Sequence, residues 1–422
     1  MYGSGSSETL RKAGTSADMK NLSIIGCGFV ADYYMLTLSK SATLRVAGVF
    51  DSIPERAVKL AERYSIPTVY NSFAQLLADD GVEIVVNLTN PRQHYETTLA
   101  CLDAGKHVYS EKPMAMTIAD AKRLVDIAER KSLQISTAPC SLLGEAAQTV
   151  WKAVRDDAIG KIRLVYAELD EDLVHKVHSG YRRNSLGLAW PAKDEFEIGV
   201  TLEHAGYYLT WLVACFGPAK TVTAFGTCLI PDKMPAESLD PPDSPDFTVA
   251  SVEFQSGTVA RITCGIVAPH DHSLTLIGDT GVIRVDDMWD YSSAIRIRPR
   301  EWNRYSQSGH VTILLVRVWK KLLKHFKFLE GLARLTNPHG RRYSLVRPVP
   351  HFEWPTVLHM DFSRGVQELA QAIDEKRESR LSTRFSLHVT ELALAIHQAR
   401  SLRQPYQMTT AFEPIEPMPW AR

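Results

Sequence analysis

A glycine-rich segment near the N-terminus has the residue types and the setting of a phosphate-binding loop. The segment 26–31, GCGFVA, follows a short apolar run at 21–25 and opens a helical stretch. Gly26 allows a tight turn, Gly28 lets backbone N–H groups approach a pyrophosphate, and alanine is an accepted third residue of this motif. The helix N-terminus adds partial positive charge. We therefore expect the phosphates of a dinucleotide to contact Gly26, Gly28, Phe29 and Val30.

An acidic residue after the second apolar run indicates which dinucleotide would bind. Asp51 follows the run 44–50 and lies 25 residues after Gly26. A carboxylate at this place accepts hydrogen bonds from the adenosine ribose and repels a 2′-phosphate, which favours NAD. Ser52 and Arg56 would lie at the same end of the cofactor, and Arg56 leaves NADP as an alternative. The competing interpretation is a glycine turn in a ligand-free sheet, with Asp51 as a helix cap.

The elements that would position these residues alternate between strands and helices. Such alternation predicts a parallel sheet covered on both faces, in the doubly wound arrangement of a dinucleotide-binding domain over 20–140. The expected strands are 21–25, 44–50, 82–88, 107–110 and 134–138. The expected helices are 54–64, 73–77, 94–104 and 117–131.

The pattern changes near residue 140. Consecutive strands with helices to one side predict an α+β domain over 141–422 with a mostly antiparallel sheet. Its expected strands are 163–170, 220–229, 247–254, 258–268, 273–278 and 281–286. Its expected helices are 146–156, 202–216, 361–376 and 386–402. The Gly/Ser/Thr-rich segment 1–19 is interpreted as a disordered extension without a secretory signal.

Composition excludes several function classes. The formal net charge is zero, with 48 basic and 48 acidic residues, so a global role in binding nucleic acid is not indicated. None of the six cysteines forms a C-x-x-C pair, so neither a zinc cluster nor a redox dithiol is predicted. Free thiols in apolar runs are typical of a reducing compartment, and we expect a cytoplasmic protein.

Two further segments carry a family resemblance. The first is NLTNP at 87–91, followed by His94, and the second is AGKHVYSEKP at 104–113. Together with the glycine loop they resemble the Gfo/Idh/MocA oxidoreductases, strongly over 21–140 and recognisably to about 290. The resemblance implies a dinucleotide-binding domain joined to an α+β domain with a large open sheet. It also implies a homo-oligomer, either a dimer or a tetramer, and a sugar, nucleotide-sugar or cyclitol as substrate.

The resemblance also implies roles for particular residues. Lys112, the lysine of the E-K-P motif, would lie beside the nicotinamide and the reacting hydroxyl, where an ammonium can help to relay a proton. Glu111 would orient the lysine or hold the nicotinamide ribose, and Pro113 would fix the turn. The remaining cofactor contacts implied by these segments are Thr89, Asn90 and His94.

The second signature of the family, G-G-x-x-x-D-x-G-x-H, is altered here. Aligning the stretch 199–208 on Gly206 places His204 at the usual Asp and Tyr208 at the usual catalytic His. Glu203 is then expected to point about 100° away. Three interpretations follow: a redox enzyme with Tyr208 and His204 as changed partners of Lys112, an epimerase, lyase or glycosidase that uses transient oxidation, and a non-catalytic nucleotide- or sugar-binding protein.

The segment 175–197 mixes aromatic rings with charges, as sugar-binding surfaces do, and the alternative is a solvated loop. A paired arginine there would also hold a phosphate or carboxylate. The substrate contacts expected in it are Tyr181, Arg182, Arg183, Trp190 and Lys193. The cluster His270-Asp271-His272 would line the pocket or form a turn, and without a third ligand at suitable spacing no metal is expected.

A basic amphipathic stretch lies inside an atypical insertion at about 291–355. Between Val311 and Tyr343 eight Lys/Arg and one Glu give a local formal charge of +7. Charges interrupt the apolar positions, so the stretch cannot span a bilayer. It is interpreted either as a helix packed on its own domain or a second subunit, or as a peripheral contact with an anionic membrane surface.

Overall fold

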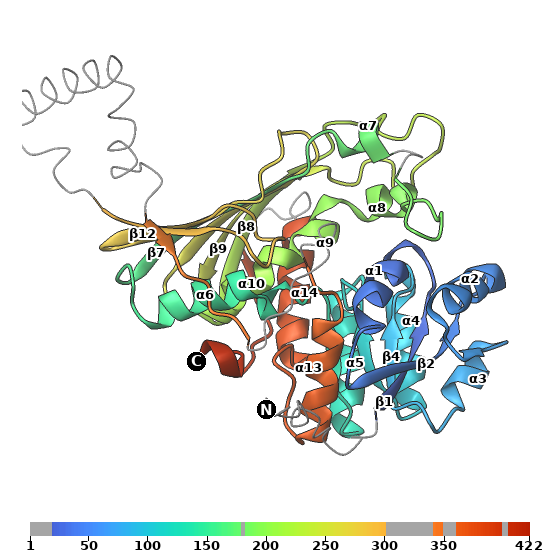
Figure 1. Cartoon of the computed structure of the whole chain (residues 1–422). Coiled ribbons are helices and arrows are strands. Elements are labelled where there is room, and N and C mark those ends of the chain that lie inside the picture. The colour runs from blue at the N-terminus through green and yellow to red at the C-terminus, as the bar shows by residue number, and fades with distance from the viewer. Residues whose placement is uncertain (1–18, 179–181, 301–340, 349–359, 399–403) are drawn as a thin grey trace, which may run out of the picture.

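The structure is a computed structural model that describes residues 19–178, 182–300, 341–348, 360–398 and 404–422. Its described residues form two sheets, with the helices α13 (Arg364–Asp374) and α14 (Thr383–His397) between them (Figure 1). The expected insertion at 291–355, with its basic stretch at 311–343, lies largely outside the described residues.

The first sheet is parallel, with the strand order β3-β2-β1-β4-β5-β6. The order reverses between β1 and β4, and the crevice at such a switch point is where doubly wound sheets bind their ligands. The strands are β1 (Lys20–Ile25), β2 (Leu44–Phe50), β3 (Thr68–Val69), β4 (Ile84–Asn87), β5 (His107–Ser110) and β6 (Ile135–Thr137). The helices are α1 (Phe29–Leu38), α2 (Pro54–Tyr64), α3 (Phe73–Leu77), α4 (His94–Asp103) and α5 (Ile118–Arg130). This arrangement confirms the predicted doubly wound fold.

The second sheet has nine strands in the order β14-β13-β12-β11-β7-β10-β9-β8-β15, and every pair except β7 with β10 is antiparallel. Its strands are β7 (Ile162–Asp170), β8 (Ala219–Thr227), β9 (Phe247–Phe254), β10 (Val259–Gly265), β11 (Leu274–Gly278), β12 (Gly281–Val285), β13 (Ile295–Pro299), β14 (Arg341–Tyr343) and β15 (Tyr406–Gln407). The mostly antiparallel sheet was predicted, but β13, β14 and β15 were not. Strand β13 precedes residues 301–340 in the sequence and β14 follows them, and the two strands pair with each other at one edge of the sheet.

Helices cover one face of the second sheet and reach the first (Figure 1). They are α6 (Glu145–Arg155), α9 (Val200–His204) and α10 (Gly206–Phe216). The short helices α7 (Val174–His178) and α8 (Ala192–Ile198) lie beyond the end of the sheet, above the first half. Helix α14 is buried along most of its length and contacts both α5 and β8, so it joins the two halves. Within the described residues, no helix is both long enough and apolar enough to cross a membrane.

Candidate functional site

A cleft of about 1140 Å³ runs along the junction of the two halves. Its walls come from the carboxyl ends of the parallel strands on one side and from α8, α9 and the loops of the second sheet on the other. All twelve cofactor contacts expected from the sequence line it: Gly26, Gly28, Phe29, Val30, Asp51, Ser52, Arg56, Thr89, Asn90, His94, Glu111 and Lys112.

The glycine loop has the geometry that a dinucleotide phosphate requires. Gly26 has φ +89°, and a Cβ at this position would lie 2.5 Å from the carbonyl oxygen of Leu88. Gly28 precedes α1, and nothing lies within 4 Å of where its Cβ would be. The first glycine therefore lets two strands approach closely, and the second leaves open space at a helix N-terminus. This cradle fits a pyrophosphate.

Asp51 connects the ends of the first two strands. Its Oδ2 accepts a hydrogen bond from the backbone N–H of Cys27 at 2.7 Å, and its Oδ1 accepts one from Ile53 at 2.8 Å. A carboxylate has about four acceptor positions, so positions remain for ribose hydroxyls. Arg56 is exposed on the same wall. The described residues therefore fit an NAD-type dinucleotide.

His94 and Glu111 line the cleft, but their polar atoms are used to hold loops in place. The two ring nitrogens of His94 lie 2.7 Å from the carbonyl of Pro113 and 3.0 Å from that of Thr89. Glu111 accepts hydrogen bonds from the Tyr34 hydroxyl at 2.7 Å and from the backbone N–H of Lys112 at 3.1 Å. Together they fix the segment that carries Lys112, whose peptide bond to Pro113 is cis.

The ammonium of Lys112 pairs with Glu203. The sequence had predicted that the Glu203 side chain points away from the site, and this prediction is wrong. The two side chains form an ion pair across the cleft, and the Glu203 side chain is only 5% exposed. Glu203 comes from α9, so this contact joins the substrate half to the E-K-P segment. Glu111 was expected to orient the lysine or to hold the nicotinamide ribose; it bonds the backbone N–H of Lys112, and Glu203 pairs with the lysine head group.

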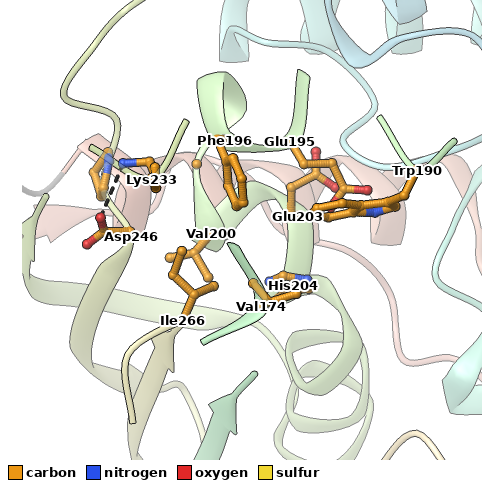
Figure 2. Close-up of a pocket in the computed structure, with 12 residues that line it drawn as sticks. Val174, Trp190, Glu195, Phe196, Val200, Glu203, His204, Lys233, Asp246 and Ile266 are labelled. Atoms are coloured by element: carbon orange, nitrogen blue, oxygen red, sulfur yellow. Dashed lines mark hydrogen bonds and ion pairs between the residues drawn. The ribbon is translucent and has the colours of Figure 1, made fainter. Parts of the chain in front are cut away.

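A second carboxyl group shares the environment of this ion pair. Glu195 and Glu203 point toward the same space beside Trp190 (Figure 2). Burial, together with the neighbouring charge of Glu203, raises the pKa of Glu195 to about 8 against the opposing effect of Lys112. Burial works against the Lys112 ammonium, but Glu203 and Glu195 together raise its pKa above the ordinary value. Near neutral pH the cluster thus holds a charged Lys112 that pairs with Glu203, and a protonated Glu195.

Tyr207, and not Tyr208, faces the cleft. The Tyr208 side chain is fully buried, and its hydroxyl donates to the carbonyl of Thr263 at 3.0 Å, away from the lining residues. Tyr207 lines the cleft four residues after Glu203, just beyond Ala205, where α9 ends and α10 begins. The alignment on Gly206 was therefore displaced by one residue. Alignment on the acidic residue Glu203 would have selected Tyr207.

His204 lines the cleft, as expected, and lies close to Glu171 and Trp289. Burial lowers the pKa of His204 to about 4, against the attraction of Glu171, so its ring is neutral near pH 7. Its Nε2 lies 3.9 Å from Glu171 Oε1. The indole of Trp289 stands between His204 and His272, with ring centroids 6.0 Å and 4.6 Å away. Glu171 and Trp289 were not anticipated, because neither belongs to a local motif.

The expected substrate contacts divide into two groups. Arg182 and Trp190 line the cleft; the Arg182 guanidinium lies 5.5 Å from the ring centroid of Phe29. Arg183 and Lys193 are exposed and do not line it, since Arg183 donates to the carbonyl of Gly187 at 2.6 Å and Lys193 lies 4.0 Å from two carboxylates. Tyr181 is outside the described residues.

A small cavity adjoins the cleft behind Glu195 and Glu203, in the region of Phe196 and Val200 (Figure 2). At its far side the buried ammonium of Lys233 pairs with Asp246 at 3.2 Å. Lys233 also lies within hydrogen-bond distance of backbone carbonyls, including that of Ile230 at 3.4 Å. Because its partners are this carboxylate, the Cys228 sulfur at 3.2 Å and local backbone, Lys233 anchors the loop and does not line the cleft.

Comparison with known protein families gives two adjacent matches. Residues 20–138 match the GFO/IDH/MocA oxidoreductase family with an NAD-binding Rossmann fold, and residues 147–284 match the GFO/IDH/MocA C-terminal domain. Trans-1,2-dihydrobenzene-1,2-diol dehydrogenase of Mus musculus is 26% identical over 270 residues, which are 63% of this chain and 74% of that relative.

Two solved structures share the architecture over nearly the whole chain. Aldose-aldose oxidoreductase from Caulobacter crescentus, complexed with glycerol, has a TM-score of 0.68 at 19% identity, covering 92% of this chain and 99% of that one. The WlbA dehydrogenase from Bordetella pertussis, in complex with NADH and UDP-GlcNAcA, has a TM-score of 0.65 at 17% identity, covering 93% and 99%. At these identities the likeness establishes the fold.

Proposed function

The chain belongs to the Gfo/Idh/MocA family of NAD(P)-dependent oxidoreductases, and from this premise we propose that it transfers hydride between nicotinamide and a secondary alcohol or ketone of a sugar-like substrate. The observation that carries the proposal is the ion pair of Lys112 with the buried Glu203. It places a cation and a proton acceptor together where the cofactor half meets the substrate half.

The chain's own residues hold the cofactor in a fixed orientation. The backbone around Gly26 and Gly28 would bind the pyrophosphate at the start of α1, and Asp51 would accept hydrogen bonds from the adenosine ribose. When bound, the nicotinamide ring takes up or returns the hydride. The segment held by His94 and Glu111 then sets the position of Lys112 relative to the substrate.

In the oxidation direction, the substrate hydroxyl must lose a proton as its carbon loses hydride. The Lys112 ammonium would hydrogen-bond the hydroxyl oxygen and stabilise negative charge on it. As the lysine receives the hydroxyl proton, it would pass one of its own protons to Glu203. Burial raises the pKa of Glu203, which suits this carboxylate to accept that proton. The lysine keeps its charge, Glu203 becomes neutral, and the carbinol becomes a ketone.

Tyr207 and His204 would position the substrate in this scheme. Burial raises the pKa of Tyr207, with Lys112 opposing, so the phenol stays protonated and acts as a hydrogen-bond donor. The neutral ring of His204 offers one donor and one acceptor to a hydroxyl-bearing ring. Arg182 and Trp190 would contact the rest of the substrate. The mouse relative is named for a ring diol and the Bordetella neighbour holds a UDP-sugar, so we propose a ring with neighbouring hydroxyls, as in a sugar, nucleotide-sugar or cyclitol.

One observation favours a second candidate reaction. Glu195 lies beside the ion pair of Lys112 and Glu203, and its raised pKa keeps its carboxyl group protonated near neutral pH. A protonated carboxyl group can donate its proton to a leaving oxygen. An epimerase, lyase or glycosidase that oxidises its substrate transiently would use it in this way. The two candidates differ in their products, because transient oxidation yields no net NADH.

The direct test is cofactor binding followed by turnover. Purified protein would be titrated with NADH and NADPH, in wild type and Asp51→Ala, and then assayed with nucleotide-sugars, aldoses and cyclitols by nicotinamide absorbance and product analysis. We expect NADH to bind more tightly than NADPH, weaker NADH binding in the variant, and net NADH formation with one substrate class. Product without net NADH would select the second candidate. Binding of neither cofactor would overturn the proposal.

Several broader expectations stay predictions. They are a cytoplasmic location, a homo-oligomeric state, the absence of a nucleic-acid partner, and a peripheral membrane contact through 311–343. The last of these depends on residues mostly outside the described ranges. Size-exclusion chromatography with light scattering would measure the oligomeric state, and co-sedimentation with anionic vesicles would measure the membrane contact.

A further inference from the structure

Three side chains with metal-ligating atoms converge at the substrate end of the cleft. One ligand atom from each of Glu171, His270 and His272 lies within 4.8 Å of the other two. We propose that these three residues form a binding site for one divalent transition-metal ion. The two histidines alone gave no metal prediction, and the third ligand comes from a segment 99 residues before His270.

The backbone holds the three ligands on one side of a strand pair. Asp170 and Asp271 form an antiparallel bridge, and each backbone N–H donates to the other's carbonyl at 3.0 Å. Successive residues of an extended chain point to opposite sides. Glu171, His270 and His272, which flank the two bridged aspartates, therefore share one side. The arrangement is set by backbone pairing and does not depend on flexible loops meeting by chance.

Two of the three proposed ligands, Glu171 and His272, have buried polar atoms without a hydrogen bond of acceptable geometry in the described part of the chain. These atoms are Glu171 Oε1 and both ring nitrogens of His272. Glu171 Oε1 lies 3.3 Å from His272 Nε2, close enough for an ion pair but poorly aligned for a hydrogen bond. Buried polar atoms are normally paired. An ion between them would satisfy both atoms at once.

A carboxylate stands behind the buried histidine. Asp287 Oδ1 lies 3.6 Å from His272 Nδ1, on the far side of the ring from Glu171, and also accepts the backbone N–H of Trp289 at 2.8 Å. Metal-binding histidines usually direct their second nitrogen to such a carboxylate, which fixes the ring orientation. Trp289 packs against the His272 ring and restricts its movement further.

The donor set indicates the class of ion. Two imidazoles and one carboxylate suit Zn²⁺ or a similar transition metal, whereas Mg²⁺ and Ca²⁺ prefer sites made of oxygen. Zinc–ligand bonds of about 2.0–2.2 Å require the three side chains to close by a small rotation. Three protein ligands leave a coordination position for the cleft, where neighbouring hydroxyls of a substrate would bind. That last step rests on the proposed function, but the metal site does not.

The test uses the full chain, stripped of metal with a chelator and titrated with Zn²⁺ against a chromophoric competitor, without cofactor or substrate. We expect one tight equivalent per chain. Glu171→Gln and His270→Ala should each weaken it by more than about tenfold, and Asp287→Asn by about tenfold. Asp271→Asn is the matched control, because this residue lies between the two histidines and points to the other side. The Asp271→Asn variant should bind Zn²⁺ with the same affinity as the wild type.

Two results would overturn the site. One is a wild-type chain that takes up no tight equivalent, which would leave His272 as an imidazolium between two carboxylates. The other is an equivalent that persists unchanged in Glu171→Gln and His270→Ala, which would place the zinc on one of the six free cysteines. His270 is exposed, so its alanine variant is expected to fold.

NADH titration of the same stripped protein separates this inference from the proposed function. Cofactor binding and turnover without tight zinc would remove the metal site and leave the oxidoreductase. Tight zinc binding that depends on Glu171, in a chain that binds neither NADH nor NADPH, would support the metal site and contradict the oxidoreductase.

Discussion

The two walls of the cleft are built in different ways. On the proposed cofactor side, the wall consists mainly of local backbone, with two glycines and a helix N-terminus, and of an aspartate that accepts from the N–H groups of Cys27 and Ile53. On the substrate side, the wall uses side chains from segments far apart in the sequence, among them Glu171, Glu203 and His272. The residues of the first wall come from short segments that each follow a strand, whereas those of the second wall are distant in the sequence and meet only in the folded chain.

This difference has a consequence for electrostatics. On the cofactor wall, the buried Asp51 carboxylate is held by backbone N–H groups, and Arg56 is exposed to solvent, which weakens its interactions. The substrate wall buries Glu203 with Lys112 and places Glu195 nearby, so protonation states there depend on neighbouring charges. We therefore expect substitutions on the first wall to change binding, and substitutions on the second to change catalysis and pH dependence.

The largest expected effect is at the contact between the two walls. Lys112→Met removes the cation that would stabilise charge on the substrate oxygen, and we expect kcat/KM to fall on the order of 10³-fold. The dissociation constant for NADH should change little, because the phosphates and the ribose are held elsewhere. Lys193→Met is the control, since that lysine is exposed outside the cleft. Equal activities of the two variants would contradict the role of Lys112.

Adjacent tyrosines provide the next test. Tyr207→Phe removes a hydroxyl that faces the cleft, and kcat should fall on the order of 10²-fold, as for the loss of one hydrogen-bond donor to the reacting oxygen. Tyr208→Phe removes the bond to Thr263, so it should cost about 1 kcal/mol of stability and leave kcat unchanged. Steady-state kinetics and denaturant unfolding of both variants measure the difference. The reverse pattern would restore the alignment on Gly206.

On the cofactor wall, the two glycines should respond differently to the same methyl group. Gly28→Ala places it in open space near the expected pyrophosphate, so NADH affinity should fall about tenfold through lost hydrogen bonds, with stability retained. Gly26→Ala forces alanine to φ +89° and against the carbonyl of Leu88, so the protein itself should lose more than about 2 kcal/mol. Calorimetric titration and thermal unfolding distinguish the two outcomes. Similar thermal stabilities for both variants would contradict the tight packing at Gly26.

The smallest expected effect concerns pH. Burial raises the pKa of Glu195 from 4.5 to about 8, so between these values the folded chain holds a proton that the unfolded chain lacks. Stability should therefore fall as pH rises through this window. Glu195→Gln should reduce that slope, whereas Asp194→Asn, an exposed neighbour on the same helix, should preserve it. Unfolding midpoints at two pH values inside the window give the slope, and an unchanged slope in Glu195→Gln would place the proton elsewhere.

The sequence by itself determined the cofactor half and its chemistry. The loop 26–31, Asp51 and the E-K-P segment are positioned by local backbone geometry, because each directly follows a strand that is visible in the sequence. All twelve residues expected on this wall therefore line the cleft. The fold class followed for the same reason, because alternation of strand and helix permits few arrangements.

Only the tertiary structure decided which side chains complete the site. A one-residue displacement on a helix rotates a side chain by about 100°, so aligning on Gly206 selected Tyr208 and rejected Glu203. The burial of Glu203 against Lys112 depends on how α9 packs over the parallel sheet. Local patterns in the sequence do not reveal this packing. In the same way, Glu171 meets His270 and His272 because two distant strand ends pair. Contacts between distant segments depend on packing, and packing exists only in the folded chain.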